Sequence, residues 1–423
     1  MAFRTSEYLQ RNELVRYQLN NVIDDMPGNN QHQSKTGYKF TTTDRSTLYD
    51  WYNAYFEVQF QVQLLADGTT TGAARISVIN GATSLINHIK IKSAGKIVYD
   101  TDNVHKVTFV KNLLECSDDF SRSVAKNTFW YLDTADSVVD GENTGFDARM
   151  ALTTGLKNVN VIIPLNRYGF FEELYERILP AMQLEFSIEL QNDNELIYKA
   201  AAGGASRVVV NRFLLWIPKI IPKDSIYEKF VDSFMKSRTW DYGKEMYTVS
   251  GPRNNSGFYM ISPSADRVKA VFVYLQRYKT DNANENPYLF DTFKLQAADN
   301  DGNVDRYLTC SLEYGNGIFY PETEYDSESK ARIFNDLMAY GMRKNNYNSG
   351  TQLNMSNYNS LYPLIFFDLS FQTEKVTRDP KQLIFRYKIN ADTQQADAFS
   401  VHAIIIYDQT VVIKKMGDEL VIV

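Results

Sequence analysis

The chain has 423 residues, which is too long for an ordinary single β domain and suits two domains of about 200 residues each. Apolar residues make up 44% of the chain and aromatic residues 13%, so it can bury a real core, and the aromatic enrichment favours strands. The net charge of −6 argues against a general nucleic-acid binder, because such proteins carry a basic excess. Two cysteines, Cys116 and Cys310, make neither a disulfide framework nor a zinc site and favour a reducing compartment.

Residues 1–45 are polar, and we expect an N-terminal arm that packs on a neighbouring subunit or on its own chain. Apolar residues from Tyr8 to Leu19 predict a short amphipathic helix within it, which Pro27 and Gly28 end. The first residues lack the apolar core of a signal peptide. No apolar run approaches the roughly 20 residues that cross a bilayer, so we expect no transmembrane segment.

The next segment is rich in predicted strands. Residues 53–65 alternate apolar residues with Gln and Glu, which is the period of a strand with one buried face. Residues 85–92 and 96–99 predict a hairpin in which Gly95 takes a positive φ. A helix is predicted at 104–122, and residues 130–156 are loop-like.

Residues 157–216 form the clearest unit of the chain. A short strand at 159–164 precedes helical spacing over 169–179, which Pro180 ends. Strict alternation then predicts a strand over 182–191, and a second apolar strand covers 208–216. Pro218 and Pro222 follow it, and since prolines are excluded from central strands they mark the best domain boundary.

The second half repeats this order. Strands are predicted at 240–249, 267–276, 362–371, 382–389 and 399–407, and a hairpin joins 290–296 to 303–314. A helix covers 327–341, capped by Ser327 or Ser329 and ended by Gly341. Residues 344–360 are predicted to form a long exposed loop. The apolar tail at 411–423 is expected to dock on a partner or add a strand, and its deletion to spare folding but impair assembly.

Two correspondences indicate a tandem duplication. Gln183-Leu184-x-Phe186 aligns with Gln382-Leu383-x-Phe385, an offset of 382 − 183 = 199. The segment 89–91 aligns with 293–295, an offset of 293 − 89 = 204, and the helix at 327–341 answers the one at 104–122. Helices are too few to alternate with strands, so the sequence predicts an all-β chain of two tandem antiparallel sandwiches with a few short inserted helices.

Three segments resemble the double jelly-roll major capsid proteins of the polinton, adintovirus and virophage group of DNA viruses and virus-like transposons. They are PLNRYGFFEELYERILPAMQLEFSIELQNDNELIY (164–198), VVVNRFLLWIPKIIP (208–222) and FSVHAIIIYDQ (399–409). The resemblance covers most of residues 45–410 and implies two eight-stranded jelly rolls, at 46–218 and 219–410, between the arm (1–45) and the tail (411–423).

The resemblance also implies a function: a homotrimer of pseudo-hexagonal outline that tiles an icosahedral shell around double-stranded DNA. Its expected partners are neighbouring capsomers and penton and minor capsid proteins, with no specific nucleic-acid binding. Its expected location is the virion, after synthesis in the host cytoplasm or nucleus. We expect the loops at 66–80, 130–156, 277–289 and 344–360 to lie on outer or intersubunit surfaces.

Two alternatives remain open at this stage. A temporary scaffold protein of the same fold would be absent from purified virions. A carbohydrate-binding protein or enzyme made of two sandwiches would need clustered aromatic residues or a carboxylate pair, whereas the four tryptophans are dispersed at positions 51, 130, 216 and 240.

The sequence predicts no catalytic, cofactor-binding or metal site, and hence no enzyme. Gly243-Lys244 lacks the rest of a phosphate-binding loop, and Gly315 and Gly317 are expected in a turn. Residues 299–305 depart from a calcium loop and suit a hairpin turn. Glu172-Glu173 with Glu176 could suggest paired catalytic carboxylates, but on a helix Glu172 and Glu176 share a solvated face. His88 and His402 are expected to be satisfied strand residues, and the glycosylation patterns at Asn254 and Asn354 to be chance matches. The basic spots at Lys219, Lys223, Lys414 and Lys415 suit a solvated face better than a contact with DNA.

Overall fold

The computed structural model describes most of the chain. The described residues are 14–22, 37–42, 47–64, 75–175, 177–180, 182–200, 204–222, 224–232, 238–253, 256–278, 285–292, 308–315, 317–326, 329–344, 351–372, 379–389, 398–416 and 419–422.

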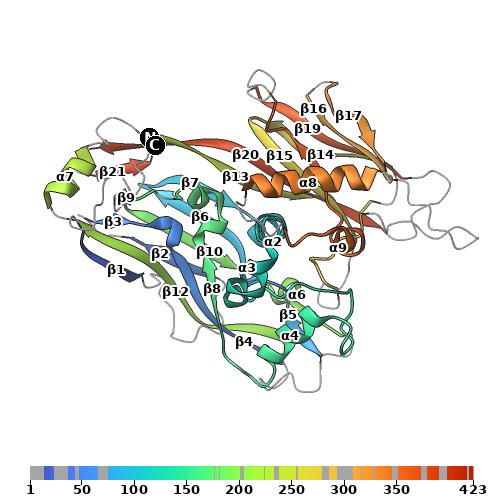
Figure 1. The fold of residues 1–423 in the computed structure, drawn as a ribbon, viewed down its shortest axis with the longest axis horizontal. Helices are drawn as coiled ribbons and strands as arrows, with labels where there is room; N and C mark the ends of the chain where they lie inside the picture. The colour runs from blue at the N-terminus through green and yellow to red at the C-terminus, as the bar shows by residue number, and fades with distance from the viewer. Residues whose placement is uncertain are drawn as a thin grey trace, which may run out of the picture.

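The first half of the chain forms a sandwich of two antiparallel sheets (Figure 1). Its eight main strands are β1 (Leu14–Val22), β2 (Gly37–Thr41), β4 (Tyr55–Leu64), β6 (Ile86–Ser93), β7 (Lys96–Thr101), β8 (Val159–Pro164), β10 (Leu184–Leu190) and β12 (Ser206–Pro222). Counted in chain order, one sheet has the order 6-3-8-1 and the other 2-7-4-5. This is jelly-roll connectivity. The short strands β3 (Leu48–Tyr49) and β9 (Leu179–Pro180) extend the first sheet, and β5 (Ile76–Val78) pairs with β11 (Ile197–Lys199).

The second half repeats the same topology. Its strands are β13 (Arg238–Val249), β14 (Gly257–Ala265), β15 (Val268–Arg277), β16 (Leu308–Tyr314), β17 (Phe319–Tyr325), β18 (Ile365–Asp368), β19 (Lys381–Ile389) and β20 (Phe399–Met416). Counted from β13, the sheets again have the orders 6-3-8-1 and 2-7-4-5, and β21 (Glu419–Ile422) is added beside β20. The predicted fold class, two tandem eight-stranded antiparallel jelly rolls, is confirmed.

Short helices are inserted between the strands. They are α2 (Val104–Glu115), α3 (Asp118–Arg122), α4 (Thr144–Thr153), α5 (Gly169–Glu172), α6 (Asp193–Leu196), α7 (Asp224–Asp232), α8 (Lys330–Lys344) and α9 (Met355–Ser360), with 3₁₀ turns η2 (Trp51–Asn53), η3 (Ala82–Leu85), η4 (Val124–Thr128) and η5 (Leu165–Arg167). Helices α2 and α8 each follow the fifth strand of their jelly roll, as the predicted repeat requires, and they pack against each other.

The alternating patterns predict the buried faces correctly. In β4, the side chains of Phe56, Val58, Phe60 and Val62 are fully buried. In β10, Leu184, Phe186 and Ile188 are buried while Glu189 is exposed. The hairpin between β6 and β7 turns at Ala94 and Gly95, both with positive φ.

One of the two repeat offsets is right and the other is wrong. Phe186 in β10 pairs with Ile91, and Phe385 in β19 pairs with Leu312, so an offset of 385 − 186 = 199 joins equivalent strands. The residue of the second jelly roll that is equivalent to Ile91 is therefore Leu312, an offset of 312 − 91 = 221 rather than 204. Most of the predicted hairpin of 290–296 with 303–314 lies outside the described part, which lacks residues 293–307. Of its described ends, 308–314 does not pair with 290–292, because β19 and β17 occupy both edges of β16.

Several predicted boundaries are wrong. The helix at 169–179 is only α5, and Pro180 lies in the edge strand β9. Residues 130–156 contain α4, helix α8 continues past Gly341, and 344–360 contains α9 and the buried Leu353. Gly341 is needed for another reason: a Cβ there would collide with the Leu114 carbonyl at the α2–α8 contact.

Strand β12 runs through both prolines that were expected to end it. The carbonyl of Pro218 accepts a hydrogen bond from Asp50 N at 3.0 Å. The N–H and C=O of a strand residue point to the same edge, so the N–H that Pro218 lacks would also point toward Asp50, just beyond the two-residue strand β3. Few ladder hydrogen bonds are required there, and proline is therefore tolerated. The proposed boundary at 218/219 therefore lies within a strand.

The two ends of the chain are part of the fold. Residues 14–22 form strand β1 rather than a helix and pair with β12, and β2 with buried Tyr38 and Phe40 lies inside the expected arm. At the other end β20 continues to Met416 and β21 pairs with it. The expectation that the tail adds a strand is confirmed, but its apolar residues Val411, Ile413 and Ile422 are buried in the core of the first jelly roll.

Candidate functional site

A buried polar site lies between the two jelly rolls, at Glu245 of β13. This carboxylate belongs to the second half of the chain, yet its side-chain oxygens accept from groups of the first half. Lys111 Nζ and Gly169 N lie 2.9 and 3.0 Å from Oε1, and Tyr99 Oη lies 2.8 Å from Oε2. The side chain is 2% exposed. One carboxylate of the second jelly roll therefore satisfies three donors of the first.

A second layer of charges surrounds this contact. Lys111 Nζ also lies 2.7 Å from Glu172 Oε2, and Arg167 pairs with Glu115 at 2.7 Å. Burial alone would lower the pKa of Lys111, but the carboxylates of Glu172, Glu245 and Glu115 together raise it well above its usual value. The amine thus stays charged and keeps both carboxylates, one from each jelly roll, in place.

The expectation for the carboxylates at 172, 173 and 176 was a solvated helix face. It is wrong for Glu172, whose side chain is about one-quarter exposed and bonded to Lys111, because α5 is a single turn held against β13. Glu176 lies outside the described residues. The sequence signal for this site is the glycine at position 169. A Cβ there would overlap the Gly243 carbonyl, so only glycine lets α5 lie this close to β13.

A second buried network ties the halves together near the loops. Arg149 and Asp133 form an ion pair at 2.7 Å with side chains 0% and 2% exposed. Asn286 of the second half donates to the other Asp133 oxygen at 2.8 Å, and Tyr362 Oη donates to the Asp133 carbonyl at 3.1 Å. Since a buried charge is costly unless it is paired, these bonds fix the relative position of the two halves.

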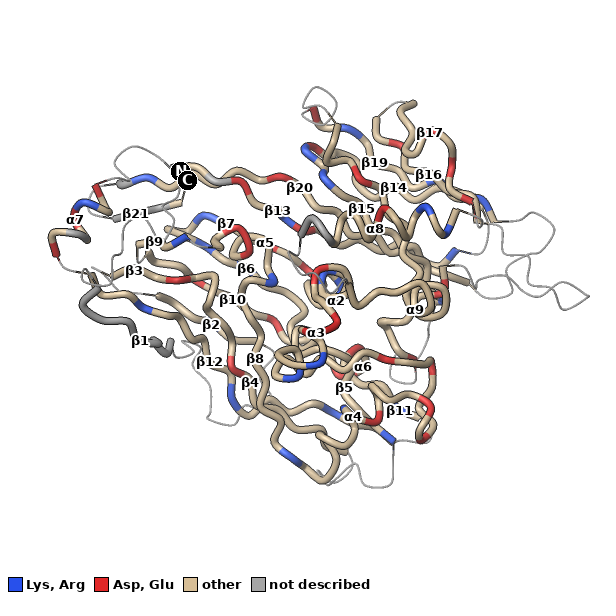
Figure 2. The backbone as a smooth tube through the Cα atoms, viewed as in Figure 1, with Lys and Arg blue, Asp and Glu red and all other residues tan. Residues whose placement is uncertain are grey.

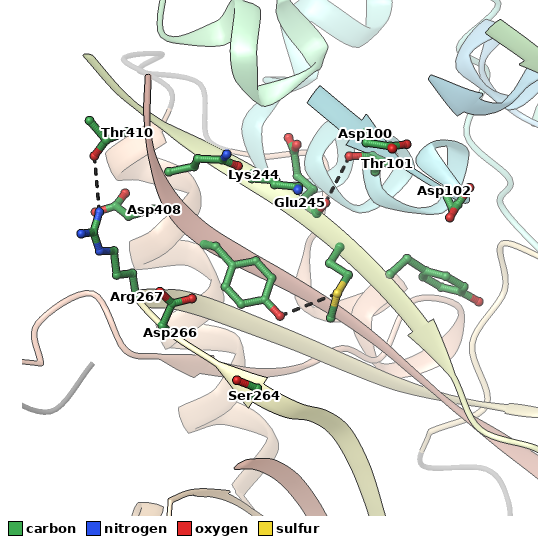
Figure 3. Close-up of a pocket in the computed structure, with 14 residues that line it drawn as sticks. Asp100, Thr101, Asp102, Lys244, Glu245, Ser264, Asp266, Arg267, Asp408 and Thr410 are labelled. Carbon is green, nitrogen blue, oxygen red and sulfur yellow. Dashed lines mark hydrogen bonds between the residues drawn. The ribbon is translucent and has the colours of Figure 1, made fainter. Parts of the chain in front are cut away.

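A groove of about 680 Å³ opens beside Glu245, between β7 of the first jelly roll and β13, β20 and the β14–β15 turn of the second (Figure 3). Thr101 Oγ1 bonds to the Glu245 carbonyl at 3.2 Å, and Arg267 to Thr410 at 3.4 Å. Its lining mixes Asp102 and Asp266 with Lys244 and Arg267.

The other residues named from the sequence have structural roles where they are described. His88 Nε2 lies 2.6 Å from Asp100 Oδ1, and His402 Nδ1 lies 2.6 Å from Tyr247 Oη, so both are satisfied as expected. Gly315 and Gly317, with positive φ, stand at the β16–β17 turn, and Asn354 caps α9. Residues 299–305, Asn254 and Lys223 lie outside the described residues.

Both cysteines are buried and free. Within the described ranges, no group of three or more His, Cys, Asp or Glu side chains is placed to hold a metal ion. In the same part of the chain, no helix is long and apolar enough to cross a membrane.

Comparison with known proteins gives matches by structure alone. No family model and no curated protein sequence matches this chain. The Faustovirus major capsid protein matches with a TM-score of 0.56 at 9% identity, covering 93% of this chain and 90% of that one. A chain of the Sputnik virophage matches with a TM-score of 0.59 at 10% identity, covering 95% and 87%, and the mavirus major capsid protein with 0.50 at 10%, covering 94% and 88%.

These matches extend over almost the whole of each chain, so they compare both jelly rolls and their mutual arrangement rather than one sandwich. Identities of about one residue in ten limit the conclusion to the fold. The chain has the double jelly-roll fold that these viral capsid proteins share.

Proposed function

We propose that this protein is a major capsid protein whose homotrimers form pseudo-hexagonal capsomers that tile an icosahedral shell around double-stranded DNA. The observation that carries the proposal is the exact repetition of strand order in the two halves, held as one body by the Glu245 contact. Three such chains present six similar walls, and six similar walls pack as a hexagon. The structural neighbours named as major capsid proteins support the same conclusion.

Pseudo-sixfold symmetry predicts which surfaces meet between chains. Within one chain, β7 and α2 of the first jelly roll face β13 of the second. The counterparts of β7 and α2 in the second jelly roll are β17 and α8, and the counterpart of β13 in the first is β1. The β17 and α8 side of one chain would therefore face β1 of the next, and this contact repeated three times closes a ring.

The exposure of β17 supports this assignment. In β7, Tyr99 and Thr101 are buried, and the side chains of both bond to Glu245 of β13 in the same chain. In β17, by contrast, Phe319 and residues 322–324 are exposed. Phe319 is 42% exposed, and Phe258 and Met260, on the far edge strand of the same sheet, are 56% and 42% exposed. The guanidinium of Arg386 lies between the two phenylalanines, with its central carbon 6.0 Å from each ring centroid. Neighbouring exposed apolar side chains are typical of a surface that a partner covers.

The described residues that flank the long loops expected at outer or intersubunit surfaces lie at one end. The segments 66–80, 130–156, 277–289 and 344–360 all follow odd-numbered strands of their jelly rolls, and antiparallel strands place such connections together. In Figure 1, α4 and α6 mark this end of the first jelly roll, whereas α7 and β21 lie at the opposite end. The loop end is the proposed outer surface.

The proposed protein acts as a structural subunit of the virion and not as an enzyme. It contacts neighbouring capsomers and penton and minor capsid proteins, and it is made in the host cytoplasm or nucleus. We propose no specific nucleic-acid binding; in Figure 2, lysine and arginine are interspersed with aspartate and glutamate along the described residues.

Sedimentation of the purified protein tests the proposal. We expect a trimer of three times 48.7 kDa, and hexagonal outlines by electron microscopy. Phe319→Glu should dissociate it by placing a charge in the interface, while Val139→Glu, at a position 54% exposed in the loop before α4, should leave it trimeric. A monodisperse wild-type monomer at micromolar concentration would count against the trimer, and a trimeric Phe319→Glu variant against the proposed contact.

A further inference from the structure

A second cleft, of about 420 Å³, lies between the two jelly rolls at the loop end. It is bounded by the start of β6 and the end of β10 in the first jelly roll, and by the ends of β13 and β15 and the start of β20 in the second. Its volume is in the range of small-molecule sites. Five carboxamide side chains line it: Asn87, Asn103, Gln191, Asn192 and Gln276.

The floor of this cleft is rigid. His402 stacks on Tyr274 with ring centroids 4.7 Å apart and planes 9° apart, and its Nδ1 lies 2.6 Å from Tyr247 Oη. Gln276 Nε2 donates to the Leu289 carbonyl at 2.7 Å, so the orientation of its carboxamide is fixed. A preorganised floor lowers the entropy lost when a ligand is ordered on it.

Two carboxamides on the first jelly roll, Asn87 and Asn103, retain hydrogen-bonding capacity. Gln191 Nε2 lies 3.4 Å from Asn87 Oδ1 and 3.1 Å from His105 Nε2, which orients the two side chains side by side. Asn103 is the residue before the first turn of α2, yet its side chain makes no capping hydrogen bond. A carboxamide offers two N–H donors and an oxygen with two lone pairs. Gln191 uses all of these, because its Oε1 also accepts from the backbone N and the Nδ2 of Asn192 at 2.9 and 3.1 Å. The contacts given for Asn87 and Asn103 use fewer.

The charges of the cleft cancel, and its rim is apolar. Lys106 and Arg277 are matched by Glu195 and Glu285 among the lining residues. Tyr278 and Val249 stand at the edge with 51% and 47% of their surface exposed. A balanced lining gives a charged ligand no net attraction, and an exposed tyrosine ring offers a flat apolar face beside the polar groups.

We propose that this cleft binds a neutral oligosaccharide. Every sugar hydroxyl both donates and accepts a hydrogen bond, as a carboxamide does, and so a row of carboxamides matches a row of hydroxyls. The C–H face of a sugar ring would pack on the exposed ring of Tyr278. The binding proposal depends on the cleft alone; a role in attachment to a glycosylated host surface depends also on the proposed function, which directs the loop end outward.

The test is binding of the purified full-length protein to an array of neutral oligosaccharides, with sialylated and sulfated ones as charged comparators. We expect binding to at least one neutral oligosaccharide. Tyr278→Ala should weaken it about tenfold, since an aromatic contact is lost. Asn87→Ala should weaken it through loss of a carboxamide. Tyr175→Ala is the matched control, because Tyr175 is 60% exposed in the segment after α5, remote from the cleft lining.

The possible results separate cleanly. Binding that falls in Tyr278→Ala and Asn87→Ala but persists in Tyr175→Ala supports the proposal, provided that all three variants keep the wild-type melting temperature. Absence of binding to every neutral oligosaccharide, binding to charged ones only, or full binding by Tyr278→Ala would overturn it. The dissociated Phe319→Glu variant should still bind, so failure of the trimer and failure of the glycan site are distinguishable.

Discussion

The Glu245 carboxylate, in the second jelly roll, accepts hydrogen bonds from three donors of the first. Removing it should weaken the contact between the two halves. Glu245→Ala leaves Lys111 with Glu172 and the Arg167 carbonyl, and leaves Gly169 N and Tyr99 Oη without their acceptor. Breaking a buried pair from one side typically costs about 3–5 kcal/mol. We expect a loss of that order in the free energy of unfolding, measured by urea denaturation followed by tryptophan fluorescence.

The control for this variant is an ion pair of similar length on the surface. Arg122 and Asp118 lie 2.7 Å apart on α3, with side chains 77% and 49% exposed. Because such pairs contribute little, Asp118→Ala should change the unfolding free energy by less than about 0.5 kcal/mol. Equal effects of the two substitutions would show that burial of Glu245 does not stabilise the junction.

At the scale of elements, the approach of α5 to β13 depends on the absence of a side chain at Gly169. Ala at this position would overlap the Gly243 carbonyl, and neither backbone can move without disturbing the Glu245 contacts. We expect Gly169→Ala to cost about 3 kcal/mol, the upper range for overpacking, by the same urea measurement. Gly251→Ala is the matched control, since a Cβ there would meet no atom within 4 Å. A neutral Gly169→Ala would contradict the close contact.

The elements that sequence predicts well are those whose pattern depends on one buried face. Alternation located β4 and β10, and the shared Gln-Leu-x-Phe located equivalent strands β10 and β19, because a strand with one buried face has a period of two wherever it occurs. Periodicity gives no information about what covers the face. The prediction for Glu172 was wrong for this reason: its partner Lys111 is 61 residues away. The prediction that Pro218 and Pro222 end strand β12 was wrong because the free-energy cost of a proline in a strand depends on whether a neighbouring strand needs its N–H, which the sequence does not show.

At the scale of the molecule, the two jelly rolls share their cores. Val411, Ile413 and Ile422, from the end of the chain, are buried among residues of the first jelly roll. In return, Val107, Val110 and Leu113 of α2 are buried among residues of the second. Neither core is complete without the other half of the chain. The two jelly rolls therefore form one rigid body, because rotating one against the other would expose both sets of apolar side chains to water.

The exchange predicts that the first jelly roll does not fold alone. A fragment of residues 1–232 lacks Val411, Ile413 and Glu245 and should be insoluble, whereas coexpression with residues 233–423 should restore a soluble, copurifying pair. Rescue should fail when the second fragment carries Ile413→Asp, since Ile413 is fully buried in the first core. It should succeed with Lys414→Asp, the next residue, whose side chain alternates to the other face and is partly exposed. A cooperatively folding 1–232 fragment would show instead that the first core closes without the tail.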